Sequence, residues 1–349
     1  MSSVADSHPS AALPPEALAA QLVMQLATGH IMSSALRCVL VYGIPDRLAN
    51  GPRAVADLAR EAEVNEDALY RVLRALSSVG LFTELPDRAF ELTLPSRMLV
   101  NGPGSLFGIA RWISDPVVIN SHAALEHSVK TGKPAFPHVH GMEVFDFFAA
   151  NPAVSAIFNE GMTSFSAAVV QAVLGAYDFN GIDTLVDVAG GHGMLLTSIL
   201  QKYPGMKGVL FDLQHVVDGA VSKIEGQGLA GRCRAEGGDF FTAVPAADAY
   251  IMKHIIHDWD DDRAVAILQT IARNMTDRVN GRVLLVESVI PAGPTPDLGK
   301  VIDLEMLVSP GGRERTADEF AALFARAGFR LTQIVPTGSP LSVLEARLA

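Results

Sequence analysis

Cysteine and basic charge are both scarce in this chain of 349 residues. Its two cysteines, Cys38 and Cys233, form no C-x-x-C pair, so neither a disulfide framework nor a cysteine zinc site is indicated. Lysine and arginine number 27 against 38 aspartates and glutamates, which gives a net charge of −11. Such a chain has no general attraction for nucleic acid or for anionic membranes. We therefore expect a cytoplasmic protein that binds neither of them.

Long apolar runs are lacking as well. No run reaches the roughly 18 residues that a membrane-spanning helix needs, and the apolar stretch 35–44 is short and contains Arg37. Residues 1–16 are rich in Ser, Ala and Pro without the basic-then-apolar order of a secretory signal, and we expect a disordered tail there. Hydrophobic residues make up 49% of the chain, which is enough for a large core spread over about two domains.

The segment 17–101 has the order helix, turn, helix, hairpin that is typical of a winged helix. Helical spacing of apolar residues predicts helices, and alternation around Pro86 predicts a hairpin. The charged residues of the candidate recognition helix sum to zero: Glu66, Asp67, Arg71 and Arg74. A helix that enters the major groove usually has excess basic charge, so we expect a dimerisation domain here, not a DNA-binding one. The expected helices span 18–41, 54–61 and 66–79, and the strands 81–85 and 89–94.

A second helical segment, 102–174, concentrates large apolar side chains. They are Phe145, Phe147, Phe148, Phe158, Met162 and Phe165. Such a group either fills a core or forms the wall of an apolar substrate pocket. The residues alone leave both interpretations open.

From residue 175 to the end, strands and helices alternate. Near-continuous apolar strands such as 283–286 suit a sheet covered on both faces, so the pattern predicts an α/β, doubly wound, mostly parallel Rossmann-like sheet. The expected strands are 184–189, 208–213, 248–256, 283–290, 329–335 and 341–346. The expected helices are 194–202, 215–225, 261–274 and 317–327.

A glycine-rich loop follows the first of these strands. Its glycines let the backbone turn tightly and approach a ligand closely. Asp212 ends the next strand, where a carboxylate can accept hydrogen bonds from a ribose diol. A nicotinamide fingerprint would need a third glycine where Leu196 stands, so S-adenosylmethionine, which carries no phosphate, fits the loop better. The loop contains Asp187, Gly190, Gly191 and Gly193.

Two further motifs are weaker when taken singly. Gly238, Asp239 and Phe240 place an acid beside an aromatic ring, an arrangement that can bind adenine or simply form a turn. His257 comes at the expected end of the strand 248–256, where open α/β sheets bind ligands and a proton acceptor is useful. An imidazole has an ordinary pKa near 6.5, so we expect this ring to be largely free to take a proton at neutral pH. A metal dyad with Asp258, or a plain core or capping histidine, is the alternative interpretation.

Two glutamates can serve this histidine. Glu287 follows a buried apolar run, and Glu314 lies in the loop 311–316. A carboxylate bonded to one imidazole nitrogen orients the ring and raises the basicity of the other nitrogen. Alternatively, Glu314 is a surface residue ahead of a helix that Thr316 caps.

Five motifs occur in one order: 187–193, 211–213, 238–240, 257–259 and 311–316. Together they resemble the S-adenosylmethionine-dependent small-molecule O-methyltransferases, a family that includes caffeate-type plant enzymes, acetylserotonin methyltransferase and bacterial enzymes of antibiotic and pigment pathways. The resemblance covers the chain from about residue 20. It implies a class I methyltransferase domain and a homodimer formed through the winged-helix-like domain.

The resemblance implies a role for each matching residue. The glycines of the loop would line the methionine and ribose of the cofactor, Asp212 would bind the ribose hydroxyls, and Asp239 with Phe240 would bind adenine. His257 matches the general base, with Glu287 and Glu314 flanking it. The remaining matches are Asp187, Gly238 and Lys253 at the cofactor, and Phe158 and Met162 at the acceptor.

Several residues depart from the family pattern. Ala189 and His192 replace a common glycine and threonine, which are mild changes. Glu305 and Ser309 stand at acceptor positions where plant phenylpropanoid enzymes carry Met and Asn, which argues against a plant-type substrate.

The predicted reaction moves a methyl group from S-adenosylmethionine to a hydroxyl of a small aromatic or polyketide-like metabolite and leaves S-adenosylhomocysteine. The hydroxyl is expected to be phenolic, and no metal is expected. Transfer to nitrogen or carbon, a relative with other chemistry, and a metabolite-sensing winged-helix regulator are the alternatives.

Overall fold

The computed structural model describes residues 14–102 and 104–349, apart from the side chain at position 165. Most of the predicted tail lies outside this range, and the first helix begins at Pro15, inside the predicted tail. The chain forms two compact units that divide between Asp115 and Pro116. No helix in the described ranges is long and apolar enough to cross a membrane. The predicted boundaries at 101 and 174 stay predictions.

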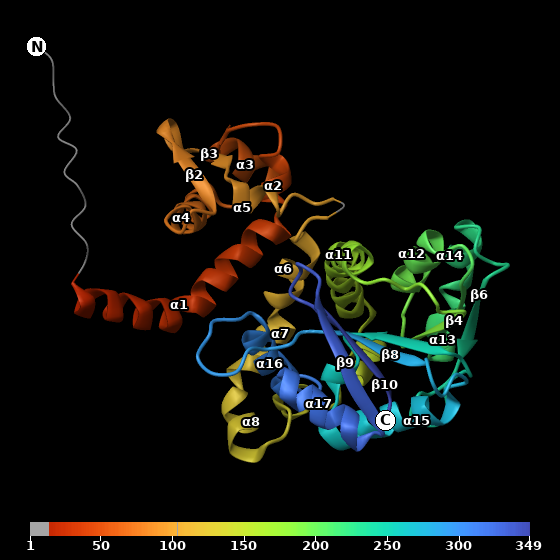
Figure 1. The fold of residues 1–349 in the computed structure, drawn as a ribbon. Helices are drawn as coiled ribbons and strands as arrows, with labels where there is room; N and C mark the ends of the chain where they lie inside the picture. Colours follow the sequence, from red (N-terminus) through yellow and green to blue (C-terminus); the bar gives the residue numbers. More distant parts are fainter. Residues whose placement is uncertain (1–13, 103) are drawn as a thin grey trace, which may run out of the picture. The chain divides into compact units, whose positions relative to one another are not determined.

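The first unit has the predicted order of helices followed by a hairpin (Figure 1). Its three short strands pair in the order β1-β3-β2. Helix α4 forms because its apolar residues recur on one face, where Leu69, Leu73 and Leu76 are buried. The Asn65 side chain caps this helix, since it accepts from the Ala68 N–H at 2.9 Å. The elements are α1 (Pro15–Val41), α2 (Ile44–Arg47), β1 (Arg53–Ala54), α3 (Val55–Ala62), α4 (Glu66–Ser77), β2 (Phe82–Leu85), η1 (Pro86–Arg88), β3 (Ala89–Leu92), α5 (Leu94–Arg97) and α6 (Phe107–Ile113).

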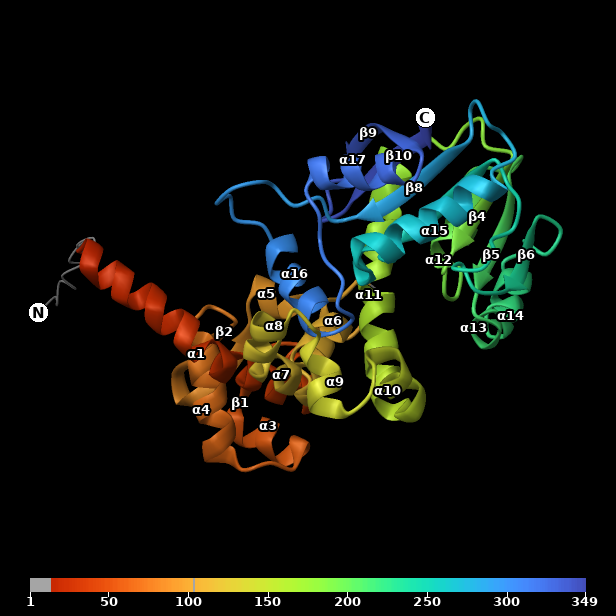
Figure 2. The ribbon, with the colours of Figure 1, turned by 90° about the horizontal axis from the view of Figure 1, so that it is seen from below.

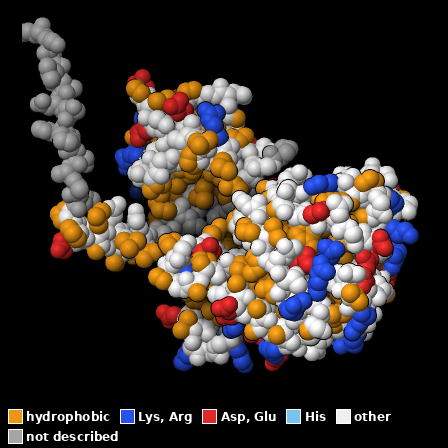
Figure 3. Space-filling model, in the orientation of Figure 1, with side chains coloured by type: hydrophobic (Ala, Val, Ile, Leu, Met, Phe, Trp, Pro, Cys, Tyr) orange, Lys and Arg blue, Asp and Glu red, His pale blue; other side chains and the backbone are white. Residues whose placement is uncertain are grey.

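Helix α1 exposes much of its apolar surface. Figure 3 shows hydrophobic side chains along it, and over half of the surface of Leu18, Leu22, Val23, Met24, Leu26 and Ile31 is accessible. Contiguous apolar surface of this kind marks an interaction site in a folded protein. The first unit therefore has a surface suited to a partner.

The second unit begins with five helices. They are α7 (Pro116–Ala123), α8 (Leu125–Thr131), α9 (Ala135–His140), α10 (Val144–Ala150) and α11 (Pro152–Ala176). The strands that follow are β4 (Thr184–Val188), β5 (Lys207–Asp212), β6 (Cys233–Gly237), β7 (Ala249–Lys253), β8 (Arg282–Glu287), β9 (Phe329–Pro336) and β10 (Ser342–Leu348). The helices among them are α12 (Met194–Lys202), α13 (Gln214–Asp218), α14 (Val221–Gly226), η2 (Ile256–Asp258), α15 (Asp261–Asn274), α16 (Gly299–Val308) and α17 (Ala317–Arg326).

These strands form one seven-stranded sheet in the order β6-β5-β4-β7-β8-β10-β9 (Figure 2). The pairs from β6 to β8 are parallel, and β10 is antiparallel to both of its neighbours. Successive residues of β8 enter two different cores: Leu284 and Val286 pack with α11 and α12, whereas Val283 and Leu285 pack with α15 and α17. Both faces of the sheet are covered, as near-continuous apolar strands require. The predicted fold class is confirmed.

Several predicted elements were wrong in extent. The strand 248–256 ends at Lys253, because His254 turns the chain with a φ of 54°, and the strand 283–290 ends at Glu287. The helix 215–225 is split into α13 and α14 around Gly219 and Ala220. Strand β6 and helix α16 were not predicted.

The order of the strands locates a crevice. The chain runs from β4 through β5 to β6 on one side, then returns to add β7 on the other side of β4. Open α/β sheets bind ligands at such a switch point, beyond the carboxyl ends of the strands. Here those ends carry Val188 on β4 and Lys253 on β7.

Candidate active site

The loop after β4 has a backbone conformation and packing that leave little room for side chains. A Cβ added to Gly190 would lie 2.5 Å from the Asp187 Cγ, and Gly191 and Gly193 have φ values of 59° and 77°. Ala189 shares this left-handed conformation with a φ of 55°, which is costly for a residue that has a Cβ. The loop is therefore shaped for close approach of its backbone to a neighbour.

Asp212 binds the loop from the end of β5. Its Oδ2 accepts from the Gly191 N–H at 2.8 Å, and its Oδ1 accepts from the Leu213 N–H at 2.7 Å. A carboxylate oxygen has more than one lone-pair site, so both oxygens can still accept from a ligand. The geometry holds Asp212 beside the glycine loop, as a ribose-binding acid requires.

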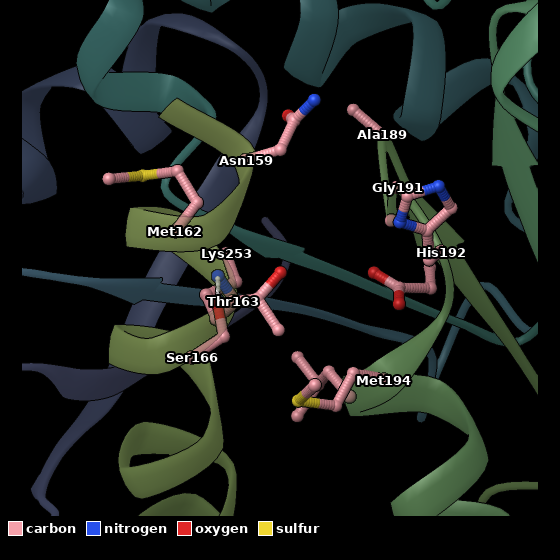
Figure 4. A pocket seen from close by; sticks show the side chains of 12 residues that line it. Asn159, Met162, Thr163, Ser166, Ala189, Gly191, His192, Met194 and Lys253 are labelled. Atoms are coloured by element: carbon pink, nitrogen blue, oxygen red, sulfur yellow. Dashed lines mark hydrogen bonds between the residues drawn. The ribbon is translucent and has the colours of Figure 1, made fainter. Parts of the chain in front are cut away.

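A cavity opens between this loop and α11 (Figure 4). Of the predicted site residues, Asp187, Gly190, Gly191, Lys253 and Met162 line it. Sequence reasoning missed the rest of its wall, although four lining residues of α11 follow the helical spacing i, i+3, i+4, i+7, a signal that was there to find. Those four are Asn159, Met162, Thr163 and Ser166, of which only Met162 was predicted, and the other lining residues that were not assigned to the site are Ala189, His192, Met194 and Leu195.

Two ionisable side chains that line the cavity, Asp187 and Lys253, interact electrostatically. Burial raises the pKa of Asp187 to about 7, partly offset by Lys253, and its Oδ2 is buried without a hydrogen-bond partner. Burial lowers the pKa of Lys253, while Asp187 and Glu287 act in the opposite direction. The Lys253 ammonium donates to the Ser166 hydroxyl at 3.0 Å. An unsatisfied buried carboxylate oxygen beside a narrow glycine cradle is a site prepared for a polar or cationic ligand.

His257 lies at the centre of a second cluster, in the turn η2. Its Nδ1–H donates to the Glu314 Oε1 at 2.8 Å, and the Glu287 Oε2 is 3.8 Å from the same nitrogen. The Asp258 Oδ1 lies 3.5 Å from Nε2, a neighbour that sequence reasoning had weighed only as a metal ligand. The structure thus brings together His257 and both predicted glutamates, and places a third carboxylate opposite Nε2.

These carboxylates control the charge of the ring. Burial lowers the pKa of His257, but Glu287, Asp258 and Glu314 outweigh burial and raise it to about 10. Burial, together with Glu314 and Asp258, raises the pKa of Glu287 to about 7 against the opposing effect of His257. Our expectation of an ordinary imidazole pKa near 6.5 was therefore wrong.

Backbone contacts hold this turn in place. The Glu287 Oε1 accepts from the N–H groups of Ile255 and Ile256 at 3.1 and 2.9 Å, which replaces the sheet partners that the chain loses after Lys253. The buried Arg315 guanidinium donates to the Ile256 and Trp259 carbonyls. Glu287 and Arg315 thus hold the backbone of the turn that carries His257.

The predicted adenine residues lie past the end of β6 and outside the walls of the cavity. The Asp239 Oδ1 accepts from the Phe241 N–H at 2.9 Å, and the Phe240 ring lies 6.1 Å from the Trp259 ring, edge to face. A Cβ on Gly238 would lie 2.6 Å from the Phe211 ring. The motif therefore forms a tightly packed turn, and adenine binding by Asp239 and Phe240 stays a prediction.

The predicted acceptor residues are spread more widely. Met162 lines the cavity, whereas Phe158 stacks on Phe148 with ring centroids 4.6 Å apart. Glu305 and Ser309 lie on and just after α16, bonded to each other at 2.7 Å. Phe158, Glu305 and Ser309 do not line the cavity beside the glycine loop.

One group of side chains could hold a metal ion. Potential ligand atoms of His254, His257 and Glu287 lie within 4.8 Å of one another. Burial lowers the pKa of His254 well below its usual range, so its ring is neutral. The expectation that no metal takes part stays a prediction.

Comparison with known proteins decides the family. Residues 122–330 match the model of an O-methyltransferase domain, and residues 24–102 match that of an O-methyltransferase dimerisation domain. This chain belongs to the S-adenosylmethionine-dependent O-methyltransferases. The second match fits a homodimer and the exposed apolar face of α1.

Three relatives illustrate the range of this family. The phenazine O-methyltransferase PhzM of Lysobacter antibioticus is 38% identical over 93% of this chain and 95% of its own. An 8-amino-8-demethylriboflavin N,N-dimethyltransferase of Streptomyces davaonensis is 35% identical over 95% of this chain and 96% of its own. The structure of CalO1, a methyltransferase in calicheamicin biosynthesis with S-adenosylhomocysteine bound, superposes with a TM-score of 0.86 at 33% identity and covers 97% of this chain and 100% of that one.

Proposed function

We propose that this O-methyltransferase transfers a methyl group to a phenolic hydroxyl of a small aromatic or polyketide-like metabolite, with His257 as the general base. The arrangement of His257 carries the proposal. Its Nδ1 is held by Glu314 at 2.8 Å, so Nε2 is the nitrogen left to exchange a proton. His257 follows Lys253, which lines the cavity, by four residues, so their Cα atoms are at most about 15 Å apart.

The cavity residues fit the cofactor. The turn of Gly190, Gly191 and Gly193 depends on glycine, because two of these residues have positive φ and a Cβ on Gly190 would clash with Asp187, and Asp212 beside it can accept from ribose hydroxyls. Asp187 and Lys253 provide one acid and one base for the charged ends of an amino acid. When bound, S-adenosylmethionine supplies an activated methyl group on a sulfonium. Asp239 and Phe240, with Gly238 behind them, would bind the adenine.

His257 is suited to take the proton of a phenol. A phenol has a pKa near 10, and the three surrounding carboxylates raise the pKa of His257 to about 10. Matched pKa values make the proton transfer close to thermoneutral, which favours general-base catalysis. Glu314 and Glu287 act as positioning residues because they orient the ring and stabilise the imidazolium that forms.

The same pKa sets a condition on activity. At neutral pH most His257 rings carry both protons, so the reactive form is either the rare neutral ring with a phenol or the imidazolium with a phenolate. Each of these forms has one proton fewer than the pair that prevails at neutral pH, which is the imidazolium with a neutral phenol. The rate should therefore rise with pH in either case.

A small-molecule acceptor would lie near Met162 and Phe158, whose apolar surfaces suit an aromatic ring.

We further propose a homodimer formed through the first unit, a cytoplasmic location, catalysis without a metal, and no nucleic-acid partner. The neutral charge of helix α4 supports the last point.

Transfer to nitrogen is the second candidate function. It is favoured by the 35% identity to the riboflavin-type N,N-dimethyltransferase. An amine needs no strong base at the point of attack, because its lone pair is already free. A panel of phenols and aryl amines, with product mass and NMR to locate the new methyl group, distinguishes the two. Methylation confined to nitrogen would contradict the proposal.

A further inference from the structure

Arg315 is a buried arginine that has so far been given no role in the reaction. Only 1% of its surface is exposed. Its Nε and Nη2 both donate to the Asp261 Oδ1, at 3.0 and 2.8 Å. Nη2 also donates to the Trp259 carbonyl at 2.9 Å, and Nη1 donates to the carbonyls of Ile256 and Arg313 at 3.2 and 3.3 Å. The five N–H donors of the guanidinium thus have five bonds, and its buried charge is paired.

Two of these bonds span the turn that carries the imidazole. Ile256 opens the turn η2, His257 follows it, and Trp259 comes directly after the turn. The guanidinium binds the carbonyls of Ile256 and Trp259, so it is fixed to the backbone on both sides of His257. A planar fork bound to both carbonyls restricts how the turn can tilt.

The loop that carries Arg315 is also fastened on both sides of Glu314. The Arg313 N–H donates to the His257 carbonyl at 2.8 Å, and the Arg315 carbonyl accepts from the Ile290 N–H at 3.1 Å. Between them, the Glu314 Oε1 lies 2.8 Å from the His257 Nδ1. These two residues are 57 positions apart in the chain, so no local structure fixes the contact. Its length depends on how firmly the loop is held against the turn.

A second anchor acts on Glu314 from another direction. The Asp303 side chain of α16 accepts from the Glu314 N–H at 2.8 Å. This bond ties the loop to α16, whereas the Arg315 guanidinium ties the loop to the turn that carries the imidazole. Arg315 is therefore the anchor placed to set the distance between the Glu314 carboxylate and the ring.

We propose that Arg315, oriented by Asp261, is the positioning residue of the His257–Glu314 pair. It holds the loop against η2, so that Glu314 stays bonded to Nδ1 and the ring keeps one orientation. Misplacement of a reacting group by about 1 Å can cost about 100-fold in rate, so loss of this clamp should slow the reaction. The effect on the rate rests on the proposed function, whereas the effect on the hydrogen bond does not.

Arg315→Lys is the sharp variant, because lysine keeps the positive charge and loses the planar fork that binds several acceptors at once. Asp261→Asn keeps the shape of the partner and removes its charge. The matched controls are Arg326→Lys and Asp262→Asn, which change a neighbouring surface pair bonded at 2.5 Å. Arg326 also lies 4.0 Å from Asp261, so its variant controls for a general change of charge around that acid.

The direct readout is the proton on the His257 Nδ1, followed by NMR of the full-length protein with isotopic nitrogen at histidine. A proton held in a short bond to a carboxylate gives a far-downfield resonance, and its absence from His257→Gln assigns it. Values of kcat and KM, S-adenosylhomocysteine affinity and melting temperature are measured on the same preparations. A purely structural role would lower the melting temperature and leave the resonance of the folded protein in place.

We expect Arg315→Lys to shift or abolish this resonance and to lower kcat by about 10–100-fold, with cofactor affinity unchanged within about threefold. Asp261→Asn should have the same effects to a smaller extent, and both controls should match wild type.

An unchanged resonance in folded Arg315→Lys overturns the inference and leaves Asp303 as the anchor of Glu314. Should Arg315→Lys fail to fold, the same resonance in Asp261→Asn decides. A shifted or absent resonance with unchanged kcat would leave the inference standing and contradict His257 as the general base.

Discussion

Two clusters at the same end of one sheet are built in opposite ways. The proposed cofactor pocket is built around one stretch of backbone: its glycine loop is contiguous, and Asp212 accepts from the Gly191 N–H of that loop. The imidazole cluster is formed by buried side chains that lie 30 and 57 residues from His257 in the chain. The first is shaped to bind a ligand, and the second is charged to hold a proton.

This difference means that the two clusters should fail separately. Changes in the pocket should weaken cofactor binding and leave the chemical step intact at saturation. Changes in the imidazole cluster should slow the chemical step and leave cofactor binding intact. Each prediction below either sharpens or breaks this separation.

Loss of the base should have the largest effect. We expect His257→Ala to lower kcat by about 10²–10⁴-fold, the usual contribution of general-base catalysis, with S-adenosylhomocysteine affinity unchanged within about threefold. His257→Gln is the matched variant, because its amide can still donate to Glu314 in place of the ring. Turnover assays and calorimetry on the same preparations check this, and unchanged turnover would mean that alignment alone drives the reaction.

Loss of the ribose acid should have the next largest effect. Asp212→Ala should weaken S-adenosylhomocysteine binding by about 10–100-fold, since one or two hydrogen bonds to a charged group are lost. The value of kcat at saturating cofactor should stay near that of wild type. Asp218→Ala, an exposed acid on α13, is the control. Calorimetry showing full affinity in Asp212→Ala would refute the assignment.

The pH dependence is the next test. Because the carboxylates raise the pKa of His257 to about 10, kcat/KM should keep rising from pH 7 into the alkaline range, where an ordinary imidazole would level off above about 6.5. Glu287 is among the groups that raise this pKa, so Glu287→Gln should move the rise to lower pH. The exposed Glu225→Gln should leave the profile in place. A wild-type profile that is flat above pH 7 contradicts this account of the cluster.

The smallest effect concerns the backbone of the loop. Ala189 has a φ of 55°, where an L-residue is strained and glycine is not. Relief of this strain slightly exceeds the entropy that glycine adds to the unfolded chain, so Ala189→Gly should stabilise the protein by about 0.5 kcal/mol. Thermal melting should show a rise of about 1–2 °C for the second unit. A fall in the melting temperature would show that the Ala189 methyl group makes a compensating contact.

The fold could be predicted wherever local pattern and tertiary packing agree. The helices 194–202 and 261–274 were predicted with the bounds that the structure shows. The first begins directly after Gly193, and the second has regular apolar spacing and an N-cap acid, Asp260. Strand β6 was missed because it is short and lies at the edge, with exposed Arg234 and Glu236 between its inward residues. Helix α16 was missed because its apolar residues follow no clear period.

The candidate site also has parts that local sequence patterns reveal and parts that they do not. The glycine loop and Asp212 could be found because both stand next to strand ends that the sequence reveals. The proximity of Glu314 and Glu287 to His257 came from resemblance, since no local rule joins residues so far apart in the chain. The raised pKa of His257 could not be predicted, because it depends on Glu287, Asp258 and Glu314 converging on one ring and outweighing the effect of its burial.

A crystal structure of the protein with S-adenosylhomocysteine and a phenolic acceptor tests the central claim most directly. We predict the nucleoside over the glycine loop, with its ribose hydroxyls within hydrogen-bond distance of Asp212 and the acceptor hydroxyl within that distance of the His257 Nε2. A complex in which the cofactor lies elsewhere, or in which Nε2 faces packed interior with the acceptor out of its reach, would contradict the account.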